Sequence, residues 1–394
     1  NTPTTVSQNP IMTLALDGGD LVVGGCFTGI GTTIRSGAAR ISTSTGAVGS
    51  WDPNVGTASD TSISSTRGCV NAIVPGSTTT YLGGSFATTG GTKRVGVVSY
   101  DSAGVLRSWN PGVDARPTSM EISGSTLYLG GLFNIVGGQQ RIELAGIDLT
   151  SGAATGLSIA GLSTTDSSIS SRAVTDLAVT ASGATVYVAG MFDCVGDRYT
   201  GTCTGTARGH AAAFATADGA LQAWAPTFTG SLVAARLALD ANNVYFAGGF
   251  TSFTVGGTSY TRRGVAAFAN DPTTTTVRPW DAGVTDGSIW GIAADGTNVY
   301  LAGTFSAIQG QPRWKLAAVA AADAATVTPA LRAWAPSLDG SLQASDPFFL
   351  DIAADGQYLY AVNQYIRGTN GGIGPRVMTS GDGQSWTGRS APRD

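Results

Sequence analysis

A short apolar motif recurs seven times along the 394 residues, and this repetition constrains the fold more than any other feature. Each copy places two or three apolar residues before Gly-Gly or Ala-Gly, then one variable residue and a Phe. The third copy, Leu-Tyr-Leu-Gly-Gly-Leu-Phe, matches the motif at every position, whereas the seventh, Leu-Tyr-Ala-Val-Asn-Gln-Tyr, lacks both the glycines and the Phe. The copies occupy residues 21–27, 81–86, 127–133, 186–192, 244–250, 299–305 and 359–365.

Three further features recur at similar positions relative to this motif, and each set of equivalent residues is called a column below. An apolar segment closed by a turn precedes each copy, as at Leu14, where Asp17 and Gly18 follow. An Arg that opens an alternating strand follows the first six copies, at Arg35, Arg94, Arg141, Arg208, Arg262 and Arg313. A Trp comes last, at Trp51, Trp109, Trp224, Trp280, Trp334 and Trp386, with Leu157 in the third repeat. Each repeat therefore predicts four strands, A to D.

The repeats predict an all-β fold, a seven-bladed β-propeller with four antiparallel strands per blade. Four short strands cannot bury an apolar face alone, whereas units stacked around an axis bury both faces and leave few open edges. The 56 glycines and the 12% of charged residues agree with short strands joined by tight turns. We expect one domain over 1–394, with blades near 11–68, 69–116, 117–172, 173–231, 232–287, 288–346 and 347–394.

The repeated residues are interpreted as scaffold. Gly-Gly pairs suit places where backbones approach closely, and the Phe and Trp columns are expected to fill the space between blades. A ring of Arg side chains could hold an anionic ligand. Because the Arg recurs in six repeats, the favoured interpretation is structural, with each Arg donating to carbonyls or to an Asp of an adjacent blade.

The repeat resembles bacterial extracellular propellers of the delta-60 or DUF5122 type, and more loosely the Rax2-like cortical marker propellers. The resemblance rests on units such as 127–141 followed by Leu-Ala-Gly-Ile-Asp-Leu-Thr-Ser-Gly at 144–152, and it covers residues 11–394. It implies a surface-exposed module without an assigned activity, so it implies no catalytic residues.

Insertions mark the fourth and fifth repeats. The motif Phe and the following Arg are 8 residues apart in the other four repeats, 16 apart between Phe192 and Arg208, and 12 apart between Phe250 and Arg262. These loops and the connections between blades are expected on one face, and the opposite face is expected to be plain.

The four cysteines fit an oxidising compartment. Cys194 and Cys203 bracket the longest insertion, which predicts a local disulfide. We expect Cys26 and Cys69 to pair across neighbouring blades on the same face as the insertions.

Candidate binding residues lie outside the repeat columns, near the elaborated face: Arg198, Tyr199, Phe253, Tyr260, Trp290 and Trp314. Exposed rings beside polar loops can stack on sugars or anchor a protein partner. The alternative interpretation is that these rings are plugs that hold the inserted loops in place.

The sequence favours a protein that is not an enzyme. It has one histidine, His210, so neither a three-histidine zinc site nor a serine–histidine–aspartate triad with spare members is available. Carboxylate-only glycosidase chemistry stays open, although Asp17, Asp240 and Asp295 are expected in turns. The sequence indicates no cofactor and no metal site.

The expected function is a secreted or cell-surface structural or adhesive module that presents its elaborated face to a partner. That partner is a protein, a surface glycan, or other copies of the chain in an oligomer or filament. The alternative is a carbohydrate-active propeller, either lectin or glycosidase. The net charge of −4 without a basic face argues against nucleic acid, and no apolar run is long enough to span a membrane.

Overall fold

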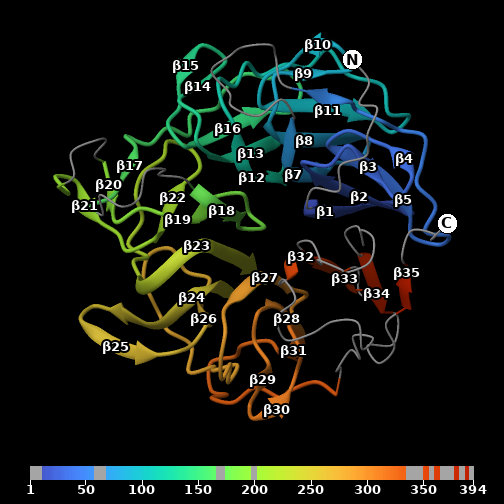
Figure 1. Cartoon of the computed structure of the whole chain (residues 1–394). Helices are drawn as coiled ribbons and strands as arrows, with labels where there is room; N and C mark the ends of the chain where they lie inside the picture. Colours follow the sequence, from blue (N-terminus) through green and yellow to red (C-terminus); the bar gives the residue numbers. More distant parts are fainter. Residues whose placement is uncertain are drawn as a thin grey trace. The chain divides into compact units, whose positions relative to one another are not determined.

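The computed structural model describes residues 11–56, 68–165, 174–196, 202–333, 349–354, 359–363, 377–380 and 387–389. Every regular element in these ranges is a β-strand (Figure 1). Contacts between Cα atoms divide the chain into two compact units. One comprises Asn1–Pro117 with Pro336–Asp394, and the other comprises Thr118–Ala335.

The first unit holds the sheets of repeats one, two and seven, each antiparallel. Strand β32 lies beside β1, and β7 lies beside β1 and β2, so the last and second sheets both neighbour the first. The strands are β1 (Ile11–Asp17), β2 (Asp20–Gly25) and β5 (Ala38–Ser42); β7 (Cys69–Pro75), β8 (Thr79–Ser85) and β11 (Val97–Asp101); and β32 (Phe349–Ala354), β33 (Leu359–Asn363), β34 (Val377–Ser380) and β35 (Thr387–Arg389).

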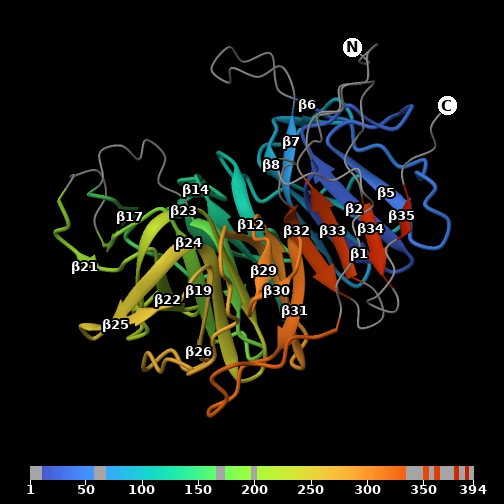
Figure 2. The ribbon, with the colours of Figure 1, turned by 60° about the horizontal axis from the view of Figure 1, so that its bottom comes forward.

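The second unit stacks the sheets of repeats three to six in chain order (Figure 2). Its strands are β12 (Pro117–Ser123), β13 (Thr126–Gly131) and β16 (Leu144–Asp148); β18 (Val174–Val179), β19 (Thr185–Gly190) and β22 (Ala211–Ala215); β23 (Thr227–Leu239), β24 (Asn243–Val255), β25 (Thr258–Thr261) and β26 (Val265–Ala269); and β27 (Ile289–Ala294), β28 (Asn298–Gly303) and β31 (Leu316–Ala320).

Short outer strands flank these sheets. They are β3 (Gly29–Ile30), β4 (Thr33–Ile34), β6 (Val55–Gly56), β9 (Thr88–Thr89), β10 (Thr92–Lys93), β14 (Ile135–Val136), β15 (Gln139–Gln140), β17 (Leu162–Ser163), β20 (Cys194–Val195), β21 (Thr206–Ala207), β29 (Ala307–Ile308) and β30 (Gln311–Pro312). Most of them pair as hairpins of two-residue strands, and these hairpins lie between the second and third strands of a repeat.

The predicted fourth strand is shorter than expected. In repeats one to six a single bridge stands in its place, for example between Ile41 and Val48 or between Phe214 and Leu221. Among the residues that the structure describes, a full fourth strand follows only in the seventh repeat, as β35. Most of the sheets therefore have three strands, because the segment before the Trp column pairs with the third strand only briefly; in repeat one the Ser42 N–H donates to the Ala47 carbonyl and the Gly49 N–H to the Arg40 carbonyl, on either side of the single bridge.

Glycines in the second strand allow a close approach to the first strand. A β-carbon at Gly303 would lie 2.1 Å from the carbonyl oxygen of Ser288, and one at Gly84 would lie 2.0 Å from that of Cys69. Both carbonyls precede a β-bulge in the first strand of the same repeat. Glycine is therefore required here for space, as the repeat pattern predicted.

The motif Phe residues form the core, as expected, together with Trp109, Trp224 and Trp280; Trp51 is half-buried, and Trp334 and Trp386 lie outside the described residues. The six Phe residues of the motif are at most 2% exposed, and Trp224 and Trp280 are fully buried. Trp280 also joins two repeats, since its indole Nε1 donates to the Ala320 carbonyl at 2.9 Å. Trp224 lies edge-on between Tyr187 of its own repeat and Phe268 of the next.

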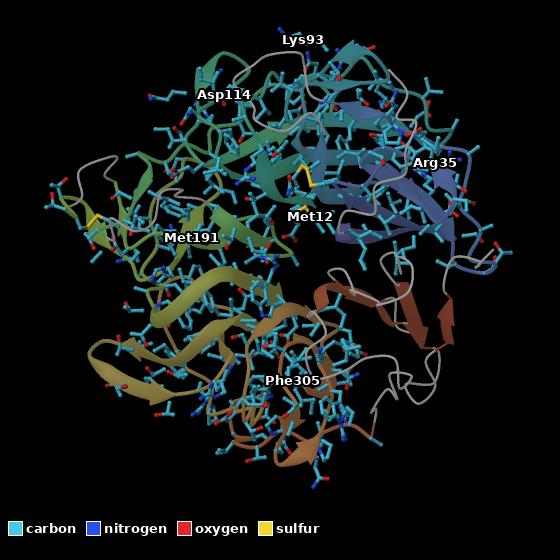
Figure 3. All side chains as sticks on the ribbon, in the orientation of Figure 1. Met12, Arg35, Lys93, Asp114, Met191 and Phe305 are labelled. Carbon is cyan, nitrogen blue, oxygen red and sulfur yellow. A yellow bond between two sulfur atoms is a disulfide. The ribbon has the colours of Figure 1, made fainter. Side chains whose placement is uncertain are left out.

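Both predicted disulfides are confirmed. Cys26–Cys69 joins the end of the first repeat's second strand to the start of β7, and Cys194–Cys203 closes the insertion of repeat four. The Met12 sulfur lies 3.6 Å from the Cys26 sulfur, and Figure 3 shows this labelled side chain close to a disulfide.

The double variant C26S/C69S tests the staple between the first two repeats. The bond spans 43 residues, so the chain-entropy relation predicts a loss of about 3 to 4 kcal/mol in the free energy of unfolding. The variant C194S/C203S opens a span of 9 residues and should lose about 2.5 kcal/mol. Urea unfolding of both variants measures the difference, and a larger loss in the second variant would contradict the prediction.

Candidate binding surface on the fifth repeat

The sequence-predicted binding residues do not form one site in the described ranges. Arg198 and Tyr199 lie outside those ranges. Trp290 is half-buried at the bulge of β27, and Trp314 is 52% exposed just before β31. Phe253 and Tyr260 face each other on the hairpin formed by β24 and β25.

The hairpin of the fifth repeat is the enlarged form of a short outer hairpin. In the third repeat the equivalent strands, β14 and β15, have two residues each, whereas β24 runs for 13 residues and β25 for four. The start of β23 pairs with the end of β24, which makes a three-stranded extension (Figure 1). Gly256 and Gly257, both at positive φ, form the turn that fixes the register.

The rings of this extension point inward, which corrects the expectation of an exposed Phe253. Phe253 is fully buried, with ring centroids 5.4 Å from Phe228 and 5.2 Å from Tyr260, which stacks on it. Phe228 in turn stacks on Phe246 at 3.7 Å. Tyr260 stays half-buried. The interpretation of these two rings as plugs that fix the inserted hairpin is therefore the better one.

Hydroxyl side chains occupy the other face of the extension. Neighbouring residues of a strand point to opposite faces, so the residues on either side of each ring face outward. Two rows result from the strand pairing: Thr227, Thr254 and Ser259 in one, and Thr229, Ser252 and Thr261 in the other. Thr227, Thr229, Ser259 and Thr261 are exposed, and Ser252 and Thr254 are half-buried.

The hydroxyl rows have a signal in the sequence that is independent of the aromatic residues. Each strand carries a hydroxyl residue, a ring and a threonine: Thr-Phe-Thr at 227–229, Ser-Phe-Thr at 252–254 and Ser-Tyr-Thr at 259–261. The period of two predicts alternating faces, but only the strand pairing brings the three triplets side by side.

Five of the six arginines in the column have a structural role, and the sixth, Arg94, donates to the adjacent Lys93 carbonyl at 3.0 Å. Arg262 donates to the carbonyls of Trp280 at 3.2 Å and Pro279 at 2.9 Å, and its Nη1 lies 3.6 Å from an Asp281 carboxylate oxygen. Four other members also donate to a carbonyl just before the Trp position of their own repeat: Arg35 to Gly49, Arg141 to Thr155, Arg208 to Gln222 and Arg313 to Arg332. Figure 3 labels Arg35 in the first repeat. Each of these guanidinium groups ties the end of its repeat to the third strand.

The single histidine also has a structural setting. His210 adopts a left-handed backbone with φ of 72°, at a position where four other repeats of the column carry Gly or Lys. Its backbone N–H donates to the Phe192 carbonyl at 2.8 Å, and its ring Nδ1 lies 3.2 Å from the Gly190 carbonyl oxygen. Both contacts are to the neighbouring strand of its own repeat.

The turn carboxylates of repeats five and six bond to their own repeats, whereas the Asp17 carboxylate pairs with Arg40 of its own repeat at 2.8 Å and accepts from the Thr80 hydroxyl of repeat two at 2.7 Å. Asp240 accepts from the Asn243 backbone N–H at 2.8 Å and from the Tyr245 hydroxyl at 2.8 Å. Asp295, Asn298 and Tyr300 repeat these contacts in the next repeat. The shared spelling Asp-x-x-Asn-Val-Tyr is a second sequence signal that went unread. These acids are engaged in turns, as the sequence predicted.

Two acids in the first strands of repeats three and four link neighbouring sheets. The Glu121 carboxylate accepts from the Val179 backbone N–H at 2.9 Å, and Asp176 accepts from that of Leu237 at 2.8 Å. Burial raises the pKa of Glu121 to about 7; the bond from Val179 opposes this effect, and the charge of Asp176 adds to it. Burial also raises the pKa of Asp176, against the influence of Arg236 and of its hydrogen bonds.

In the part of the chain that the structure describes, three or more His, Cys, Asp or Glu residues nowhere gather as metal ligands would. The same ranges contain no helix with the length and apolar character needed to cross a membrane.

Comparison with known proteins defines a class of fold rather than a family. No family model and no curated protein matches the sequence. The fold is similar to that of the computationally designed protein Ika8 (TM-score 0.50, 13% identity, 91% of this chain and 94% of that chain) and of Kuenenia stuttgartiensis hydrazine synthase (0.51, 13%, 92% and 95%). The Neurospora crassa Pan2 WD40 domain matches with a TM-score of 0.49 at 11% identity, over 90% of this chain and 86% of that chain.

The likenesses to Ika8 and to hydrazine synthase bear on the fold class. The chain is an all-β repeat protein whose antiparallel sheets follow one another along the sequence. At 13% identity, the likeness to Ika8 and to hydrazine synthase shows the fold alone.

Glu121 should make stability depend on pH. Its pKa is near 4.5 when unfolded and about 7 when folded, so its stabilising contribution is complete below pH 4.5 and is lost as pH rises through 7. We expect the free energy of unfolding to fall by on the order of 2 to 3 kcal/mol between pH 5 and 8 through this group. Urea unfolding should show this slope in the wild type and a flatter one in E121Q; equal slopes would contradict the assignment.

Phe253 and Tyr260 should differ in their effect on folding. Because Phe253 is fully buried, F253A should lower the free energy of unfolding by about 3 to 5 kcal/mol. Y260A removes a half-exposed ring and should cost clearly less. Thermal unfolding of the two variants measures the difference, and similar small losses would show that Phe253 is accessible in solution.

Proposed function

We propose that the chain is a single-domain, seven-bladed β-propeller, with blades near 11–68, 69–116, 117–172, 173–231, 232–287, 288–346 and 347–394. Three observations support this arrangement. The sheets of repeats three to six stack in chain order, β32 lies beside β1, and a fourth-strand bridge recurs in repeats one to six. The resemblance to delta-60 type repeats belongs to the same proposal.

We further propose that this propeller is a non-catalytic module, secreted or at the cell surface, that binds a partner through its elaborated repeats. The extended hairpin of repeat five carries this proposal. It is an uncharged hairpin with one solvent-facing side and is longer than its counterparts, since the third and sixth repeats close with two-residue strands. The partner is a protein, a surface glycan or another copy of the chain.

Chemical details favour binding over catalysis. His210, Asp240 and Asp295 are engaged with their own repeats. Glu121 and Asp176 accept backbone N–H groups of the neighbouring sheet. Two disulfides support an oxidising location.

The second candidate is a carbohydrate-active propeller. The outward hydroxyl rows favour its lectin form, because hydroxyl groups both donate and accept hydrogen bonds as sugars do. A glycosidase needs two acids placed about 5 to 10 Å apart around a bond, and the hairpin extension carries no acid between 251 and 261.

A loop exchange tests the binding role. Residues 251–261 are replaced by 134–140, the segment that joins the motif Phe to the Arg in repeat three. We expect binding to lose at least about tenfold in affinity, or about 1.4 kcal/mol. The measurements are a glycan array, labelled binding to the cells that make the protein, and sedimentation velocity for self-association.

The matched control replaces 306–312, the equivalent segment of repeat six, with the same seven residues, and it should leave binding unchanged. Because the exchange of 251–261 removes the buried Phe253, its melting temperature should be the lower of the two, and circular dichroism at the assay temperature establishes that both exchanged proteins are folded. Binding that survives the repeat-five exchange would overturn the proposal, as would turnover of glycoside substrates by the wild-type chain.

A further inference from the structure

We infer that the two hydroxyl rows of the repeat-five hairpin bind an extended, neutral polysaccharide. This inference rests on the proposed binding role and gives that role a ligand class. The surface consists of Thr227, Thr254 and Ser259 beside Thr229, Ser252 and Thr261 and is called the hydroxyl grid below.

The side chains of the grid are ordered by the backbone. Thr229 Oγ1 and Ser252 Oγ lie 3.0 Å apart across two strands, which shows that paired members share one face. Neighbouring strands of a sheet are about 4.7 to 4.9 Å apart, and alternate residues along a strand about 6.6 to 6.8 Å apart. Six hydroxyl-bearing residues therefore cover an area of about 10 by 7 Å.

The grid is held rigidly from behind. Phe228, Phe253 and Tyr260 form the row between its two rows on the opposite face, with centroids 5.4 and 5.2 Å apart. The turn at Gly256 and Gly257 fixes the pairing of β24 and β25. A ligand would therefore meet a preformed surface, which lowers the entropic cost of binding.

The chemistry of the grid selects a neutral, hydroxyl-rich ligand. Each hydroxyl is one donor and two acceptor sites, and within the described ranges those of Thr254, Ser259 and Thr261 have no protein partner. None of the six residues is ionisable. An anionic ligand would need Arg or Lys donors. The two guanidinium groups nearest in sequence have partners within the protein: Arg262 donates to the carbonyls of Pro279 and Trp280, and the exposed Arg263 interacts electrostatically with Asp286.

The shape of the grid favours a polysaccharide over a single sugar as the ligand. Small ligands are usually bound in concave pockets that bury most of their surface, whereas the grid is an exposed sheet face. On such a face each contact is weak, and affinity comes from several hydroxyls binding successive residues of one polymer. The interstrand spacing is close to the length that one pyranose ring adds to an extended chain, so one ring can meet each strand.

Affinity gel electrophoresis tests the inference with soluble neutral polysaccharides as probes: hydroxyethyl cellulose, xylan, mannan and dextran, with anionic alginate for comparison. The variant T229V/S252A/T261V removes one row of hydroxyls and keeps the β-branched shapes that suit strands. The matched control S77A/T78V/T92V makes the same three changes at exposed positions of the second repeat.

We expect at least one neutral polysaccharide to retard the wild type and the control, and the grid variant to bind at least about tenfold more weakly with an unchanged melting temperature. A second variant, T229A/S252A/T261A, should behave like the first, which separates hydroxyl loss from added apolar surface. Equal retardation of the grid variant and the control, or no retardation of the wild type, would overturn the inference.

The outcomes also separate this inference from the proposed function. If exchange of 251–261 removes surface binding while the grid variant keeps it, the hairpin binds by another route and only the polysaccharide inference fails. If both changes leave surface binding intact, the proposed function fails as well. Loss of binding to a protein surface alone, without any retardation in the gels, would assign the grid to a protein partner and overturn the inference.

Discussion

The structure depends on the close approach of the first two strands in a repeat. A bulge brings the first strand so near that a β-carbon at Gly84 or Gly303 would collide with a backbone carbonyl. The bulge of β18 also aims Thr175 at the next repeat, where its hydroxyl donates to the Ala235 carbonyl; Thr118 of β12 likewise donates to the Val174 carbonyl of the repeat that follows it. Sheets rich in small residues can therefore stack closely, and the large Phe and Trp side chains fill the space that is left between neighbouring sheets.

Much of this scaffold was readable from the sequence because it repeats. The motif located the sheets, the arginine column bonded to carbonyls as expected, and both disulfides followed from loop positions. The sequence predicts too long a fourth strand, because the segment before the Trp has the composition of a strand. The length of a strand depends instead on how many residues stay within hydrogen-bonding distance of the neighbouring strand. One bridge per repeat shows that the two backbones soon diverge.

The candidate site was harder to predict, since its residues occur once. A ring in a polar loop suggests exposure, and Phe253 and Tyr260 were expected to be accessible for that reason. The sheet instead buries Phe253 against Phe228 and turns the neighbouring hydroxyls outward. Alternation predicts that rings and hydroxyls take opposite faces, but which face meets solvent is decided by packing against Phe246 of β24 and Phe268 of β26, and this packing follows from the folded sheet rather than from the alternation.

The contact between β1 and β32 has a consequence for how the chain folds. Nearly every other pairing joins strands of one repeat or of its immediate neighbour, so these contacts close short loops and form early. Bringing the first and last sheets together requires the ends of almost the whole chain to meet, although the entropy lost grows only with the logarithm of loop length. Assembly of this unit should therefore end with its two terminal sheets, and the seam between them is where a slow step in refolding would arise.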